Sequence, residues 1–300
     1  MSETRVAPPA ASGSSRQPVR GMSAAGGHAS PLQPPLPPTY APRTWSGIQK
    51  VAAITEVEVR KLSHDQWDLV TRSVQPVLWL LLFGGVFGRL RVLPAGMGGY
   101  LDFVAPGILA QSVLTIAIFQ GIMVIWERDQ GTLQKYLVSP MPRAALVLGK
   151  GLGSGMRGSL QAVAITLIAA LMGVHINLNP LAWLGILAAV FLGAVLFSTM
   201  SLVIAALVRT RERVQGLGQL ILMPLFFASN ALYPVAIMPA YVAVVTTLNP
   251  LSYMVDALRG LMVTNSVGSH YGLPIDFAVL IAVNIAIVTL AARLYPRVVQ

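Results

Sequence analysis

The sequence predicts an all-α polytopic membrane protein with six transmembrane helices, an N-terminal amphipathic interfacial helix, and a re-entrant helical hairpin between helices 5 and 6. The first observation is the composition, because 55% of the 300 residues are hydrophobic and only 11% are charged. A soluble domain carries roughly 25% charged residues, so this chain lacks the polar surface that would cover a globule. The second and third observations are long apolar segments and a one-sided distribution of Lys and Arg.

The first 66 residues divide into two parts. Segment 1–44 is rich in Pro, Ser, Ala and Gly and is predicted to be a disordered cytoplasmic tail, because it cannot bury enough apolar surface to offset ordering. Segment 45–66 is predicted to be an amphipathic helix in the membrane interface, with a cytoplasmic helix packed on a partner as the alternative. Ile54 and Val57 interrupt its apolar stripe. The stripe consists of Trp45, Ile48, Val51, Ala52, Val59 and Leu62.

Six segments are long and apolar enough to be membrane spans, since a helix needs about 20 apolar residues to cross roughly 30 Å of hydrocarbon. They lie at about 69–89, 103–126, 153–174, 181–207, 215–237 and 274–293. A further apolar stretch at 238–263 contains Pro239, Pro250, Asp256 and Arg259, which disfavour a continuous spanning helix. A re-entrant hairpin is predicted there, because broken backbone at membrane depth needs protein around it.

The positive charges fall on one side of this topology. Seventeen Lys and Arg residues lie in 1–66, in 127–157, in 209–213 and in the C-terminal tail, against three on the opposite side. Lys and Arg are enriched in cytoplasmic loops, so both termini and the segment 127–143 are predicted to be cytoplasmic. The net charge of +10 forms no continuous basic face, and no nucleic-acid partner is expected.

Groups that carry catalytic chemistry are sparse. The chain has no Cys and its four His are far apart, so neither thiolate chemistry nor a metal site is predicted. The predicted second to sixth spans hold no ionisable residue well inside the apolar core, which disfavours the alternative of an ion-coupled secondary transporter. Around Gly149 and Lys150, Ala144 and Gly151 occupy positions where a Walker A motif needs Gly and Ser or Thr. No catalytic residue is assigned, and the chain is not expected to be an enzyme.

The segment ERDQGTLQKYLVSPMPR at 127–143 is a compact charged stretch between two apolar spans. Gly131 permits a sharp turn, and Pro140 ends the short helix that follows. A face of apolar side chains at i, i+3 and i+4 is formed by Leu133, Tyr136 and Leu137. A face this small cannot form its own core, so we expect it to dock into a groove on another protein. A loop helix among lipid headgroups is the alternative.

Three stretches resemble motifs of type-2 ABC exporter permeases of the daunorubicin-resistance and nodulation-export type. The pattern E-R-D-Q-G-T-L-x-x-x-L-V-S-P-x-P-R at 127–143, followed by Gly-Lys, is similar to the exit of the family's second span. QPVLWLLLFGGVFG at 75–88 resembles its first span. NALYPVAIMPAYVAVVTTLNPLSYMVDALRGLM at 230–262 resembles the end of its fifth span and its re-entrant region. The resemblance covers about residues 45–295 and excludes the proline-rich tail.

The resemblance implies that 67–300 is the transmembrane domain of a four-part exporter in a bacterial plasma (inner) membrane. Two permease subunits, identical or different, would form the path through the lipid, and two copies of a cytoplasmic ABC ATPase would drive it. ATP and Mg would bind the ATPase, with no cofactor on this chain. Segment 127–143 would include the coupling helix, and 45–66 the connecting helix. The uncharged path fits a hydrophobic or amphipathic substrate such as a drug, lipid or glycolipid, with a polysaccharide or glycoconjugate as the alternative.

Three sets of candidate site residues follow. Coupling to the ATPase is assigned to Glu127, Arg128, Gly131, Thr132, Leu133, Tyr136, Leu137, Pro140 and Arg143. The substrate pathway is assigned to Gln75, Gln111, Gln120, Ser198, Thr199, Gln219, Phe226, Phe227 and Asn230. The alternative role of such polar residues is hydrogen bonding between helices. The re-entrant region contributes Asn249, Pro250, Tyr253, Asp256 and Arg259. Glu127 is expected to pair with Arg143, and Asp256 with Arg259.

Overall fold

A computed structural model of the chain describes residues 47–64, 66–87, 99–131, 143–208, 210–264 and 270–294. These residues contain helices and no strand, and one isolated β-bridge joins Ile176 to Val263. The predicted all-α class is therefore correct for the described part of the chain. The tail predicted at 1–44 lies outside it.

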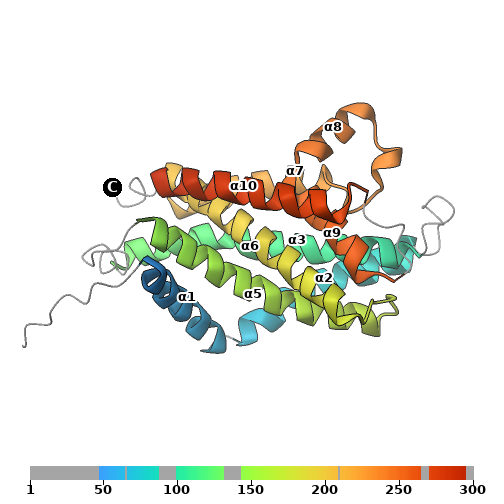
Figure 1. Ribbon diagram of the computed structural model, residues 1–300, viewed down its shortest axis with the longest axis horizontal. Coiled ribbons are helices and arrows are strands. Elements are labelled where there is room, and N and C mark those ends of the chain that lie inside the picture. Colours follow the sequence, from blue (N-terminus) through green and yellow to red (C-terminus); the bar gives the residue numbers. More distant parts are fainter. Residues whose placement is uncertain are drawn as a thin grey trace, which may run out of the picture. The chain divides into compact units, whose positions relative to one another are not determined.

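The helices follow one another in the order shown in Figure 1. They are α1 (Gly47–His64), α2 (Gln66–Phe87), α3 (Tyr100–Asp129), α5 (Arg143–Leu171), α6 (Pro180–Leu207), α7 (Arg211–Phe227), the 3₁₀ turn η1 (Val235–Ile237), α8 (Ala240–Leu248), α9 (Pro250–Met262) and α10 (Leu273–Leu294).

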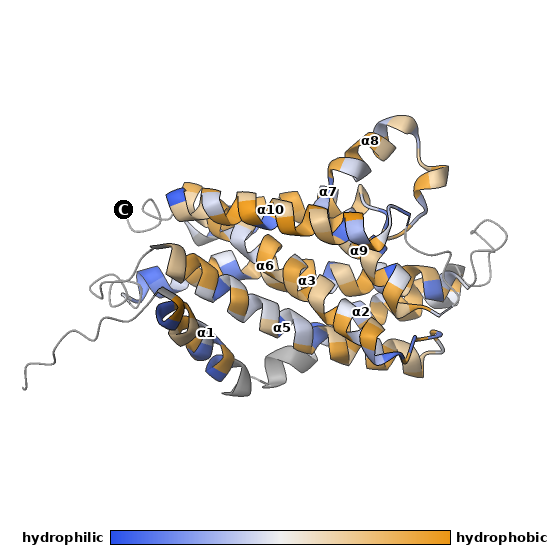
Figure 2. Cartoon of the chain, in the orientation of Figure 1, coloured by the Kyte–Doolittle hydropathy of each residue, from blue (hydrophilic) through white to orange (hydrophobic). Residues whose placement is uncertain are grey.

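Four of these helices are long and apolar enough to cross a membrane, namely α3, α5, α6 and α10. Figure 2 shows hydrophobic residues along the length of each. They lie where the second, third, fourth and sixth spans were predicted, although α5 begins at Arg143 rather than near 153. A chain with several such helices is a polytopic membrane protein.

The helices α2 and α7 lie at the predicted first and fifth spans. α7 has 17 residues and ends at Phe227, short of the end predicted at 237. The Ser229 hydroxyl donates to the carbonyl of Phe226 at 2.6 Å, and Pro234 disfavours helix over the residues before it. A total of six spans stays a prediction.

The helix α6 lies at the centre of the packing and contacts α3, α5, α9 and α10. It approaches α3 closely at Gly121, whose backbone N–H donates to the Ser201 hydroxyl at 3.0 Å. A Cβ atom at Gly121 would lie 2.6 Å from the backbone oxygen of Ser201. Small residues at such contacts let membrane helices approach closely, so this glycine determines the spacing of α3 and α6.

The N-terminal helix α1 packs along α5, as Figure 1 shows. The contact is made by Ile54, which is 5% exposed, and by Glu58, which is 4% exposed. A Cβ atom at Gly149 would lie 2.6 Å from the Ile54 side chain, so the glycines of α5 provide the space that α1 occupies. Ile54 is one of the two residues that interrupt the apolar stripe, whereas Ile48 in the stripe is 82% exposed.

The region predicted to be a re-entrant hairpin contains two short helices, α8 and α9, separated at Asn249. The Asn249 side-chain oxygen accepts from the backbone N–H of Leu251 at 3.0 Å and caps α9, which starts at Pro250. The Asn249 amide also donates to the carbonyl of Leu225 at 2.6 Å, which attaches the break to the end of α7. Placement of the hairpin within the membrane stays a prediction.

Candidate functional site

Five charged side chains from three helices meet beside the predicted coupling segment. We call them the charge cluster: Glu58 and Lys61 on α1, Glu127 on α3, and Lys150 and Arg157 on α5. Helix α3 ends at Asp129, within the first residues of the segment, and α5 begins at Arg143, its last residue, so the cluster joins the helices at both ends of the segment.

The two carboxylates of the charge cluster are each shared between cations. In Glu127, Oε1 accepts from Lys61 Nζ at 2.9 Å, and Oε2 accepts from Lys150 Nζ. In Glu58, Oε1 lies 3.0 Å from Lys61 Nζ and 3.7 Å from Lys150 Nζ, and Oε2 lies 3.7 Å from Arg157 Nη2. Lys61 and Lys150 therefore each bridge α1 and α3, and the network joins all three helices.

Burial makes these contacts strong and mutually dependent. The side chains of Lys150 and Glu58 are 3% and 5% exposed. A buried charge is costly unless it is paired and hydrogen-bonded, so each member needs the others. Burial disfavours the charged form of Lys61, but its hydrogen bond to Glu127 and the charges of Glu58 and Glu127 outweigh burial, and the pKa of Lys61 is raised.

Arg157 extends the charge cluster to Gln120 on α3. Its Nη1 donates to the side-chain oxygen of Gln120 at 2.9 Å, so Gln120 links α3 to α5. Gly153 makes room for the cluster, because a Cβ atom there would lie 2.4 Å from the Cβ of Glu58.

The structure describes three of the predicted coupling residues fully. Glu127 belongs to the charge cluster, Arg128 pairs with Asp129 at 3.1 Å, and Gly131 has a φ of 70°, which favours glycine. The side chain of Arg143 lies outside the described residues, so its pairing with Glu127 stays a prediction. The remaining members also lie outside the described residues, namely Thr132, Leu133, Tyr136, Leu137 and Pro140.

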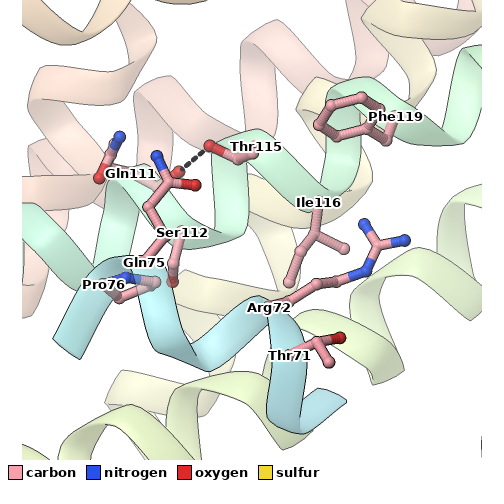
Figure 3. Close-up of a pocket in the computed structure, with 9 residues that line it drawn as sticks. All are labelled: Thr71, Arg72, Gln75, Pro76, Gln111, Ser112, Thr115, Ile116 and Phe119. Carbon is pink, nitrogen blue, oxygen red and sulfur yellow. Dashed lines mark hydrogen bonds between the residues drawn. The ribbon is translucent and has the colours of Figure 1, made fainter. Parts of the chain in front are cut away.

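A pocket of about 380 Å³ opens between α2 and α3 (Figure 3). Gln75 of α2 and Gln111 of α3, both predicted pathway residues, are part of its wall. Arg72 lies on the same wall, with its guanidinium 6.0 Å from the centroid of the Phe119 ring. This pocket places two of the nine predicted pathway residues at one site.

The other pathway candidates are dispersed. The hydroxyls of Ser198 and Thr199 donate to the carbonyl of Val195, at 3.1 Å and 2.7 Å, and are buried within the core. Gln219 is exposed on α7. Phe226 is buried with its ring 6.5 Å from that of Trp79, and Phe227 is 44% exposed.

Asn230 belongs to a buried polar group near α9. Its amide lies 3.5 Å from Asp256 Oδ1, and its carbonyl accepts from Arg259 Nη2 at 2.8 Å. The Arg259 guanidinium lies 4.0 Å from the centroid of the Phe103 ring, and Asp256 accepts from the backbone N–H of Tyr271 at 2.8 Å. Asp256 and Arg259 thus both bind Asn230, and their direct pairing stays a prediction.

The remaining hairpin residue, Tyr253, donates its hydroxyl to the carbonyl of Thr247 at 2.7 Å. This bond joins α9 to α8 across the break at Asn249. Together with the Asn249 cap, it connects the two helices of the hairpin.

Comparison with known proteins places this architecture in a family. The profile of the family described as ABC-2 type transporter matches residues 49–263. The protein ycf38 of Cyanophora paradoxa, named as a transport permease, is 29% identical over 215 residues, 71% of this chain and 73% of its own length. The daunorubicin resistance ABC transporter permease protein DrrB1 of Streptomyces coeruleorubidus is 26% identical over 66% of this chain and 70% of its own. The inner membrane transport permease YadH of Escherichia coli K12 is 25% identical over 63% of this chain and 75% of its own. The chain therefore belongs to the ABC-2 type transporter family of membrane permeases.

Proposed function

We propose that this chain is the transmembrane subunit of an ATP-binding-cassette exporter that moves a hydrophobic or amphipathic substrate, such as a drug, lipid or glycolipid, out of the cytoplasm or inner leaflet. Membership in the ABC-2 family implies association with an ABC ATPase. ATP hydrolysis takes place on that separate chain. The observation that carries the proposal is the charge cluster, which ties α1 to the two helices on either side of the segment 132–142.

The charge cluster supplies a physical route for transmission. The segment 127–143 docks on the ATPase through Leu133, Tyr136 and Leu137. Because Glu127 and Lys150 bind each other and Lys61 also binds Glu127, a displacement of the segment moves α1, α3 and α5 together. Helices α3 and α5 pack on α6, so the displacement reaches the membrane part of the chain. ATP binding and release then favour two different arrangements of the permease.

The proposed function includes a membrane topology and a subunit assembly. The charge cluster and both termini lie on the cytoplasmic side, α1 is the connecting helix of segment 45–66, and 67–300 forms the transmembrane domain with its re-entrant region at 238–263. Two such subunits, identical or different, assemble with two ATPase subunits in a bacterial inner membrane. The excess of Lys and Arg on one side supports this orientation.

The substrate pathway includes the pocket between α2 and α3. Its volume of about 380 Å³ lies at the lower end of the range of ligand sites, and it combines amide groups with the apolar side chains of Ile116 and Phe119. The name of DrrB1 refers to daunorubicin resistance, which supports a drug as one candidate substrate for this chain.

Docking through the predicted apolar face has a direct test. The double substitution Leu133→Asp plus Leu137→Asp is expected to abolish co-purification with the ATPase. Each change places a charge where an apolar side chain is buried, and burial of one such side chain contributes about 1.5–3 kcal/mol. The measurement is the amount of ATPase retained on the tagged permease, together with ATP hydrolysis by the purified complex.

The matched control is Gln134→Asp plus Lys135→Asp, which adds the same two carboxylates to the same segment on side chains predicted to face elsewhere. The control is expected to retain the ATPase. Normal binding and normal ATP hydrolysis in the Leu133/Leu137 variant would show that this face does not couple the two chains.

A further inference from the structure

Two amide side chains in the pocket between α2 and α3 have no hydrogen-bond partner among the described residues. One is Gln111 of α3, which is only 5% exposed, and the other is Gln75 of α2, at an exposed position. Figure 3 shows the two side chains on the helices that form the wall. A buried amide without a partner carries a desolvation cost, because lipid hydrocarbon supplies no hydrogen bonds. A ligand in the pocket removes this cost by forming the missing bonds.

The hydroxyl groups that line the pocket add acceptors to the amides. Ser112 donates to the carbonyl of Leu109 at 2.7 Å, and Thr115 donates to that of Gln111 at 2.9 Å. Each hydroxyl proton is therefore used within α3, but each hydroxyl oxygen can still accept a hydrogen bond. An amide supplies two N–H donors and one acceptor oxygen. The pocket thus offers a ligand both donors and acceptors.

The pocket favours a neutral ligand over a charged one. No Asp or Glu lines it in the part of the chain that the structure describes, so a cation finds no carboxylate there. Arg72 and Thr71 line it, but both already interact with other groups of the chain. A phosphate would accept from the amide N–H groups and leave the amide and hydroxyl oxygens without donors. A neutral head group with several hydroxyls pairs with both kinds of group, since a hydroxyl donates and accepts.

The rest of the wall is apolar and the space is limited. Pro76, Ile116 and Phe119 supply hydrocarbon and ring surface beside the amides. A volume of about 380 Å³ lies at the lower end of the range of ligand sites, which suits one sugar ring rather than a chain of sugars. The pocket is open, so an alkyl chain attached to that ring can extend out of it.

We propose that this pocket binds the neutral, hydroxyl-bearing head group of an amphipathic molecule, such as one sugar ring on an alkyl chain, through the amides of Gln75 and Gln111. Ile116 and Phe119 contact the apolar part of the ligand. This inference rests on the proposed export function and narrows its substrate class to neutral amphiphiles. It disfavours phosphate head groups, which donate too few hydrogen bonds, and quaternary ammonium groups, which form none.

Photolabelling of the intact complex tests this assignment. The full chain with its ATPase is placed in phosphatidylcholine nanodiscs and exposed to three photoactivatable probes with the same alkyl chain: dodecyl glucoside, dodecyl phosphate and dodecyltrimethylammonium. Dodecyl glucoside is expected to label peptides of α2 and α3, and unlabelled dodecyl glucoside is expected to displace it. The two charged probes are expected to label these peptides only weakly.

Three substitutions of the same kind make the test specific. Gln111→Leu keeps the size of the side chain and removes its amide, and it is expected to reduce labelling by dodecyl glucoside by about three- to tenfold, the effect of losing one or two neutral hydrogen bonds. Gln75→Leu is expected to reduce labelling by a similar factor, at an exposed position where the change does not disturb the core. The control is Gln219→Leu on α7, which does not line the pocket, and labelling of α2 and α3 is expected to stay unchanged.

Stability separates a ligand site from a contact between helices. Gln111→Leu is not expected to lower the free energy of unfolding, because the Gln111 amide forms no hydrogen bond to the described residues. Gln120→Leu on the same helix is expected to lower it, because the Gln120 side-chain oxygen accepts from Arg157 at 2.9 Å. Chemical unfolding of the detergent-solubilised protein measures both changes. An equal loss of stability in the two variants would show that Gln111 serves packing rather than a ligand.

Equal labelling by the three probes, or unchanged labelling in both Gln111→Leu and Gln75→Leu, would overturn the assignment. ATPase retention and ATP hydrolysis are measured in the same preparations. A wild-type chain that retains no ATPase contradicts the proposed function. A complex that hydrolyses ATP but does not discriminate between head groups contradicts only the assignment of a neutral, hydroxyl-bearing ligand.

Discussion

Replacement of Lys150 by Met is expected to lower the free energy of unfolding by about 3–5 kcal/mol, the cost of removing one partner from a buried ion pair. Lys150 is 2% exposed and binds Glu127, and it lies 3.7 Å from Glu58. The substitution keeps the length of the side chain but leaves the two carboxylates with less positive charge around them. Chemical unfolding of the detergent-solubilised protein, followed by its helical content, measures the difference.

Two comparisons separate burial from charge in this result. Lys61 contacts the same two carboxylates, but its side chain is 45% exposed, so Lys61→Met is expected to cost no more than about 1 kcal/mol. Combining Lys150→Met with Glu127→Gln removes the unpaired charge and is expected to recover much of the loss. Equal effects of Lys150→Met and Lys61→Met would contradict a buried network.

Replacement of Arg259 by Met is expected to have an effect of similar size, about 3–5 kcal/mol, at α9. Arg259 is 7% exposed, donates to the carbonyl of Asn230 at 2.8 Å and lies over the Phe103 ring. The charge of Asp256, which is fully buried, stabilises that of Arg259. Without the cation, the buried Asp256 carboxylate loses the positive charge of Arg259, and the attachment of α9 to α3 and to Asn230 through Arg259 is lost. The change is measured by unfolding in detergent, as for Lys150.

The control for Arg259 is Arg213→Met on α7, where the side chain is exposed and the expected change is small. The double variant Asp256→Asn plus Arg259→Met removes both charges and is expected to be more stable than Arg259→Met alone. A double variant that is less stable than Arg259→Met would show that the two charges do not act as a pair.

Much of the helical architecture could be predicted from the sequence, because it depends on local patterns. The apolar segments gave the positions of α3, α6 and α10 to within a few residues. Pro239 and Pro250 correctly indicated that the stretch 238–263 does not form one continuous helix. The end of α7 was less predictable, since the residues after Phe227 are apolar but turn where Ser229 competes for a helix carbonyl.

The charge cluster shows what a single sequence does not reveal. Glu58 and Lys61 are three positions apart on α1, which is a recognisable spacing, but their partners Glu127 and Lys150 are far away along the chain. The pairing depends on α1 packing against the glycines of α5, and neither residue type nor helical period specifies that contact. Ile54, which interrupts the predicted apolar stripe, was the available sign that α1 buries a different face from that stripe.

The substrate-pathway candidates were predicted from their residue types, and the sequence did not show which of them lie together. Gln75 and Gln111 lie in one pocket, but Gln120 is committed to Arg157 and Ser198 to its own helix. Whether a polar side chain in a span faces a cavity or a neighbouring helix depends on how the helices are rotated. That rotation is set by tertiary packing and is not encoded in the count of polar residues.

The most direct test of the central claim, that segment 127–143 docks on the ATPase from the cytoplasmic side, is site-specific crosslinking within the complex. Benzoylphenylalanine in place of Tyr136 is expected to crosslink to the ATPase. The same residue in place of Tyr241, which is 76% exposed on α8, is expected to give no crosslink, because six spans with cytoplasmic termini would place the region between the fifth and sixth spans on the opposite side from the ATPase. An ATPase crosslink from position 241, or none from position 136 in a complex that still hydrolyses ATP, would contradict the account.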